Sequence, residues 1–182
     1  MNKGEFLARL TIWITLAGYF VGVTLYSLPP QGEKRDRAAR IAWTVACLSL
    51  LAHFACAFHF YHHWSHDTAY RVTARQTAEL FGLDWGGGLY LNYALLVGWV
   101  ADVVWWWRGL EAYRNRLRTL GAVWQGFLLF MFFNATVVFK DGALRYIGLL
   151  LCLAVCLLWW YAAASSSSLG DESKAPEDTV KN

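Results

Sequence analysis

Charged residues are scarce in this chain, and their scarcity excludes an ordinary water-soluble domain. Only 16% of the 182 residues are Asp, Glu, Lys or Arg, whereas 57% are hydrophobic. A soluble domain carries roughly a quarter charged residues, spread over every element. Here the charges are clustered, and long stretches have almost none. We therefore expect lipid to be the solvent for most of the chain, which forms one domain.

The sequence also lacks the short motifs of several enzyme classes. It has no C-x-x-C pair, no nucleophile elbow and no dinucleotide-binding fingerprint, and the run Gly86-Gly87-Gly88 has no Gly-Lys-Ser/Thr after it. All four cysteines lie inside apolar segments, where they are expected to pack as small apolar residues. A net charge of only +3 does not favour nucleic acid as a partner.

Five apolar stretches are long enough to cross a bilayer, which takes about 20 residues of α-helix. They lie at residues 10–28, 41–64, 88–107, 121–139 and 146–164. The predicted fold is all-α: a polytopic integral membrane helical bundle of about five transmembrane helices, formed by residues 1–164. The serine-rich, polar segment 165–182 is predicted to be a disordered tail.

An odd number of spans places the two termini on opposite sides of the membrane. Ten Lys and Arg residues fall on the side of the connections 29–40 and 108–120 and of the tail, and six fall on the other side. Because basic residues concentrate in the cytoplasm, we expect the N-terminus outside and the C-terminus inside a cell (inner) membrane.

All five histidines lie on the second span or its extension, within residues 53–66. If that helix continued, the last four would share one sector near the outer membrane face at about 100° per residue, with Asp67 at its edge. Alternatively, the helix breaks near Ser65 and a cap starts a new one. Imidazole is the commonest metal-binding side chain, so the candidate metal ligands are His59, His62, His63, His66 and Asp67.

One helix cannot surround an ion or a haem, and other segments must complete such a site. We expect the three glycines at 86–88 to bring the outer connection over the histidines. A haem with two histidine ligands needs imidazoles from different helices. Within one subunit, the remaining option pairs His53 with Met131, which also lies near mid-membrane; otherwise a haem would bridge two copies of the chain.

Among the polar residues inside predicted spans, Asn92, Asp102 and Asn134 are further candidates for a functional site. An ionisable residue in a span is costly and is a functional candidate by default. If Asp102 has a structural role instead, we expect it to form an ion pair with Arg40 or Arg108, or to accept a hydrogen bond from Trp43 or Trp105. Asp102 shares a helix face with Asn92 and Trp99, so that face is expected to point into the bundle.

The leading hypothesis is a membrane protein that binds a transition metal ion or haem at an outward-facing histidine cluster, for electron transfer or redox chemistry. One alternative is a non-catalytic subunit that packs in a larger membrane complex or as a homo-oligomer. Another is a proton-linked transport path between the histidines and Asp102. No sequence motif decides whether the chain is an enzyme.

Overall fold

The structure, a computed structural model, describes residues 3–28, 32–138 and 142–172. In these ranges the regular elements are helical: α1 (Lys3–Ser27), α2 (Glu33–Phe60), α3 (His66–Phe81), α4 (Gly88–Arg108), α5 (Leu110–Arg114), α6 (Arg118–Phe133), the π-helical turn η1 (Asn134–Val138) and α7 (Ala143–Glu172). Five helices are long and apolar enough to cross a membrane: α1, α2, α4, α6 together with η1, and α7. The predicted bundle of five transmembrane helices is thereby confirmed.

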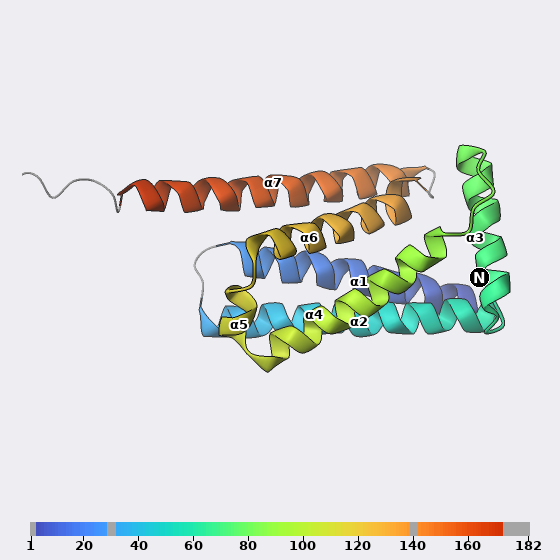
Figure 1. Ribbon diagram of the computed structural model, residues 1–182, viewed down its shortest axis with the longest axis horizontal. Helices are drawn as coiled ribbons and strands as arrows, with labels where there is room; N and C mark the ends of the chain where they lie inside the picture. The colour runs from blue at the N-terminus through green and yellow to red at the C-terminus, as the bar shows by residue number, and fades with distance from the viewer. Residues whose placement is uncertain (1–2, 29–31, 139–141, 173–182) are drawn as a thin grey trace, which may run out of the picture.

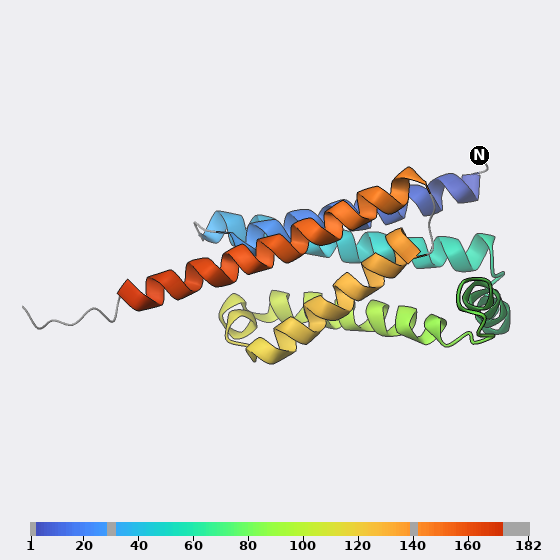
Figure 2. The same cartoon turned by 90° about the horizontal axis from the view of Figure 1, so that it is seen from above.

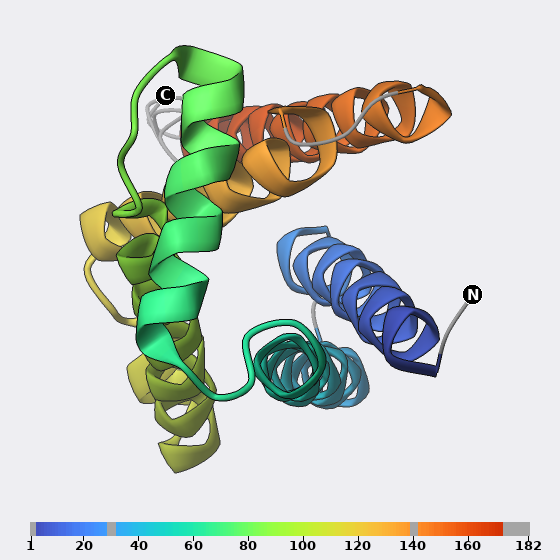
Figure 3. The same ribbon diagram turned by 90° about the vertical axis from the view of Figure 1, so that its right-hand side faces the viewer.

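The five long helices run alongside one another, and α3 lies across one end of the bundle (Figure 1). Seen from above, the start of α1 lies at this same end, and α5 and the end of α7 lie at the opposite one (Figure 2). The end view shows α3 crossing over the end of α4 (Figure 3), against which it packs. We refer to these as the α3 end and the α5 end of the bundle.

Small residues allow α1 and α2 to pack closely along their length. A Cβ atom on Gly18 would lie 2.9 Å from the Cβ of Ala46 and 3.0 Å from the carbonyl oxygen of Ala42. A Cβ on Gly22, one turn further along α1, would lie 3.0 Å from the ring of Trp43. Small residues four positions apart let helix backbones approach each other in membranes, so these glycines hold the α1–α2 pair together.

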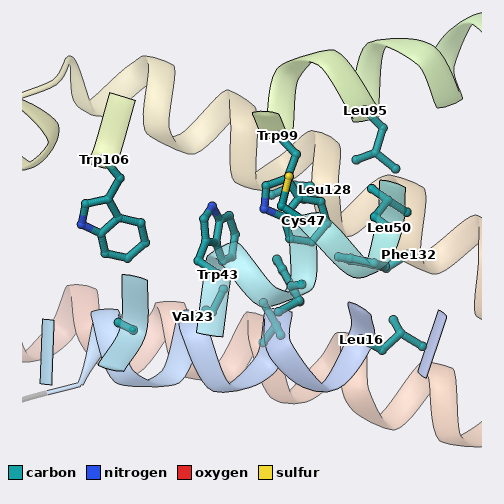
Figure 4. Packing of buried hydrophobic residues seen from close by; sticks show 14 of the residues in the cluster. Leu16, Val23, Trp43, Cys47, Leu50, Leu95, Trp99, Trp106, Leu128 and Phe132 are labelled. Atoms are coloured by element: carbon teal, nitrogen blue, oxygen red, sulfur yellow. The ribbon is translucent and has the colours of Figure 1, made fainter. Parts of the chain in front are cut away.

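Aromatic rings fill the space between this pair and the other helices. Tyr19, Trp43 and Trp99 are almost completely buried and their ring centroids lie 5.1–6.2 Å apart. Figure 4 shows Trp43 of α2 pointing toward α4, between Trp106 and Trp99, with Leu128 and Phe132 beyond Trp99. Rings at these separations contribute packing energy beyond the area they bury, so the core is rigid as well as apolar.

The C-terminal helix is longer than the sequence suggested. α7 continues to Glu172, beyond the predicted boundary between span and disordered tail at residues 164 and 165. Extending an existing helix adds one hydrogen bond for each residue fixed, and no proline interrupts 165–172. The rest of the predicted tail, residues 173–182, lies outside the described residues.

Substituting Gly18→Val is expected to lower the free energy of unfolding by about 1–3 kcal/mol, the usual cost of overpacking. The added side chain would meet the Ala46 Cβ and the α2 backbone, so the two helices must separate. The matched control is Gly126→Val on α6, where a Cβ meets no atom within 4 Å. Thermal unfolding in detergent compares the two variants, and equal midpoints would contradict the close α1–α2 contact.

Candidate functional site

The predicted stripe of four histidines does not form, because the second span ends before residue 64. α2 ends at Phe60, and α3 begins at His66 with Ser65 as its N-cap, whose hydroxyl accepts a backbone N–H at 3.2 Å. Between the two helices, His63 and Trp64 have φ angles of 49° and 57°, and the chain turns there so that α3 lies across the end of the bundle (Figure 1). The continuous helix was therefore wrong, and the break near Ser65 is confirmed.

The histidines around this turn face different surroundings. His59 and His63 are exposed, and His62 is half-buried with its ring 5.5 Å from that of Phe58. Burial, together with the neighbouring His63, lowers the pKa of His62 below its ordinary value. The buried Nδ1 of His62 has no hydrogen-bond partner among the described residues. The lowered pKa favours the neutral form of His62, which is the form in which an imidazole binds a metal.

The remaining two predicted ligands make other contacts. The Nδ1 atom of His66 lies 3.0 Å from the hydroxyl oxygen of Tyr93. Asp67 forms an exposed ion pair with Arg71, with an N–O distance of 3.0 Å. Across residues 3–28, 32–138 and 142–172, no three His, Cys, Asp or Glu side chains lie close enough to share a metal ion. The structure does not bring the five predicted ligands together.

A cavity of about 560 Å³ instead lies beneath α3, and we call it the α3 cavity. Its lining includes His53, His62, Gln76, Asn92 and Met131, which come from α2, the turn after it, α3, α4 and α6. The Nδ1 atom of His53 lies 2.9 Å from the carbonyl oxygen of Ala8. Asn92, one of the polar residues predicted inside a span, lines this cavity. Gly86, from the predicted glycine run, packs against Tyr70 of α3.

The carboxylate of Asp102 is buried at the α5 end. It accepts from the indole N–H of Trp43 at 2.8 Å, from the hydroxyl of Tyr113 at 3.0 Å and from the guanidinium of Arg116 at 2.8 Å. The side chains of Asp102 and Arg116 are only 8% and 9% exposed. Donors from α2, α5 and the connection before α6 therefore meet on one carboxylate of α4.

The rings around this carboxylate hold Arg116 in place. The Arg116 guanidinium lies 4.0 Å above the ring of Tyr113. Tyr113 in turn stacks on Trp106, with ring centroids 4.6 Å apart and planes 3° apart. Burial, followed by the nearby Asp102 charge, raises the pKa of Tyr113 well above its ordinary value, so the hydroxyl stays protonated and remains a donor.

A second cavity, of about 510 Å³, opens beside the Asp102 cluster, and we call it the α5 cavity. Its lining includes the rings of Tyr26, Trp43, Trp106, Tyr113 and Trp159, which belong to α1, α2, α4, α5 and α7. Among the described residues that line it, Arg116 is the only charged one and Gln125 of α6 carries the only amide. A mostly apolar pocket with a few convergent polar groups is the usual form of a small-molecule site.

The sequence predicted part of this arrangement. Asp102 and Trp99 were expected to face the bundle interior, and both are buried; the hydrogen bond from Trp43 was also anticipated. The expected ion-pair partner, Arg40 or Arg108, was wrong. Arg116 takes that place, because the single helical turn of α5 returns the chain toward α4. Arg40 lies over the ring of Trp107 instead, at 4.1 Å.

Asn134, the third polar residue predicted inside a span, has a local role. Its side-chain amide donates to the carbonyl oxygen of Phe130 at 2.8 Å, where α6 passes into η1. A hydrogen bond of this kind satisfies a backbone carbonyl at an irregular turn within a span.

Comparison with protein-family models, with curated proteins and with solved structures finds no match to this chain.

Substituting Asp102→Asn is expected to lower the free energy of unfolding by about 3–5 kcal/mol, because it leaves Arg116 as an uncompensated buried charge. The double variant Asp102→Asn with Arg116→Gln should recover much of this loss, since no unpaired charge remains. Unfolding in detergent, followed by near-ultraviolet circular dichroism of the surrounding tryptophans, measures both. A double variant no more stable than the single one would contradict the ion pair.

Proposed function

We propose that this protein binds a lipid-soluble small molecule in the α5 cavity. The observation that carries the proposal is a cavity of about 510 Å³ that is walled by aromatic rings and lined by Arg116, which forms a buried ion pair with Asp102. Its volume lies within the roughly 300–1,000 Å³ of small-molecule sites. The ligand would enter from the membrane, because most of the lining is apolar and belongs to the spanning helices.

The cavity is supported by a framework that resists collapse. Trp43 and Trp106 are 2% exposed and pack against Tyr19, Trp99 and Tyr26 on their other sides. Trp43 is also fixed by its hydrogen bond to Asp102. Pre-formed sites bind more tightly because less conformational freedom is lost on binding. The aromatic framework therefore favours ligand binding over a purely structural role for this region.

Filling the cavity is expected to abolish ligand binding. Ala122 of α6 lines the cavity, so Ala122→Phe would occupy it. The matched control is Val123→Phe at the next position, which is 64% exposed and does not contribute to the lining. Wild-type protein purified in lipid nanodiscs should retain a lipid-soluble compound at near-stoichiometric amount on organic extraction and mass spectrometry.

The Ala122→Phe variant should retain at least about tenfold less of that compound, a change of about 1.4 kcal/mol, and Val123→Phe should match the wild type. Retention that is equal in all three proteins would reject the α5 cavity as the site. If the wild type also retains no compound after incubation with a membrane lipid extract, a non-catalytic subunit becomes the better interpretation.

A second candidate function is electron transfer through haem in the α3 cavity. The observation that favours it is that His53 of α2 and Met131 of α6 line the same cavity, of about 560 Å³. Histidine and methionine from different helices form one of the common axial pairs of haem iron. A carbonyl oxygen only accepts, so the 2.9 Å contact with Ala8 requires a proton on Nδ1 of His53. A metal-binding histidine usually donates its other ring N–H to a group of this kind.

On this proposal, His53 matters and the exposed His59 does not. His53→Ala should remove the Soret band of protein reconstituted with haem, whereas His59→Ala should leave it unchanged. This is the reverse of what a stripe of four histidines on one helix would give. Absorbance spectra and iron content of the three proteins measure it. A wild type without a Soret band after reconstitution would reject haem binding.

A further inference from the structure

We propose that the ligand of the α5 cavity is a quinone, a planar lipid-soluble ring whose carbonyl oxygens accept hydrogen bonds. This inference rests on the proposed function and adds the chemical class of the ligand. Three features of the site support it: several lining side chains carry N–H donors, the charge of Arg116 is neutralised by Asp102, and the walls are aromatic.

Beside the hydroxyl groups of Tyr26, Ser27 and Tyr113, the cavity is lined by side chains that carry N–H donors. The oxygen of the Gln125 amide accepts from the hydroxyl of Tyr19 at 3.3 Å, so its nitrogen is a donor to other partners. The indole N–H of Trp106 is buried and has no acceptor among the described residues. Arg116 has five N–H donors, one of which binds Asp102. A ligand that suits this lining presents acceptors, as the carbonyl oxygens of a quinone do.

The Trp106 donor is the most informative of these groups. The indoles of Trp99, Trp106 and Trp124 each have a buried N–H with no partner in the described part of the chain. Of these three, Trp106 alone lines the α5 cavity. A buried donor without a partner costs free energy comparable to a lost hydrogen bond. The Trp106 N–H is buried beside the cavity and does not open into it, so a ligand carbonyl would reach it, and remove that cost, after the indole ring turns toward the cavity.

Charge compensation favours a neutral ligand. Arg116 forms its ion pair with Asp102 at 2.8 Å, and both side chains are more than nine-tenths buried. The neighbouring Arg114 is likewise paired with Asp36 at 2.6 Å. A fatty acid or a phospholipid phosphate would bring a negative charge to a site whose cation is already neutralised by a carboxylate. The site therefore fits a neutral carbonyl better than an anionic headgroup.

The walls suit a flat ring. Trp106 and Tyr113 stack face to face, and Tyr26 lies edge-on to both, at 75°. Trp43 and Trp159 contribute further aromatic surface from α2 and α7. Planar rings pack on aromatic side chains through offset-stacked and edge-to-face contacts, whereas an acyl chain gains only its buried area.

The test is a binding titration with protein in nanodiscs of lipid that contains no quinone. The probe is a benzoquinone with a decyl tail, and the reference compound is a benzene ring with the same tail and no carbonyl groups. Isothermal titration should show saturable binding of the quinone and at least about tenfold weaker binding of the reference, as expected for the loss of hydrogen bonds to buried donors.

A matched pair of variants tests the predicted carbonyl contact. Trp106→Phe removes an N–H that has no partner in the described residues, so it breaks no existing hydrogen bond. It should weaken quinone binding about tenfold and leave binding of the reference compound unchanged. Trp99→Phe removes an equally buried and unpartnered N–H outside the cavity and should leave quinone binding unchanged. Thermal midpoints of both variants show whether the fold is retained.

The outcomes separate this inference from the proposed function. Equal binding of the quinone and the carbonyl-free reference would overturn the quinone assignment. The assignment would also be overturned if oleate or phosphatidylglycerol displaced a bound native lipid and the quinone did not. In either case the proposed function stands if Ala122→Phe still abolishes binding. If no compound binds and Ala122→Phe changes nothing, the proposed function fails as well.

Discussion

The fold depends on how one buried carboxylate is satisfied. Asp102 lies within an apolar span, where an unpaired charge costs several kcal/mol or more. Its donors come from α2, from α5 and from the connection before α6, so the bundle cannot bury Asp102 without bringing these segments together. Such hydrogen bonds specify which surfaces meet, whereas apolar surfaces in lipid have little preference for one another. The single turn of α5 and the return of Arg116 toward α4 follow from this requirement.

The close pairing of α1 and α2 serves the same end of the molecule. Gly22 lets α1 approach Trp43, and Trp43 is one of the Asp102 donors. The glycine packing therefore sets the depth at which the Trp43 ring lies, and with it one wall of the α5 cavity. Substitutions on α1 that contact neither Asp102 nor the cavity should still alter the ligand site through this chain of contacts.

The spans and the buried face of α4 could be predicted from the sequence, because both follow from apolar length and helical periodicity. The arrangement of the histidines could not be predicted, because the stripe assumes that the α-helix continues through residues 61–65. No glycine or proline marks a turn in that segment. Two non-glycine residues there take positive φ, a conformation that sequence rules disfavour. Ser65 was the signal that pointed to the break. The ion pair between Arg116 and Asp102 could not be predicted either. Arg116 lies in a short connection, and the path of such a connection does not follow from its residue pattern.

The two ends of the bundle differ in how firmly their polar groups are held, and this difference bears on where a ligand binds. At the α3 end, His59 and His63 are exposed, Asp67 pairs only with a neighbour one turn away, and the Nδ1 of His62 has no partner among the described residues. At the α5 end, Asp102 and Arg116 are buried and bonded to each other and to fixed rings. A bound molecule gains most where the surrounding groups are already ordered. The α5 cavity is bordered by groups of this kind, whereas His59 and His63 at the α3 end are exposed. Ligand binding is therefore assigned first to the cavity beside Asp102, ahead of the histidines, although these are the most conspicuous residues in the sequence.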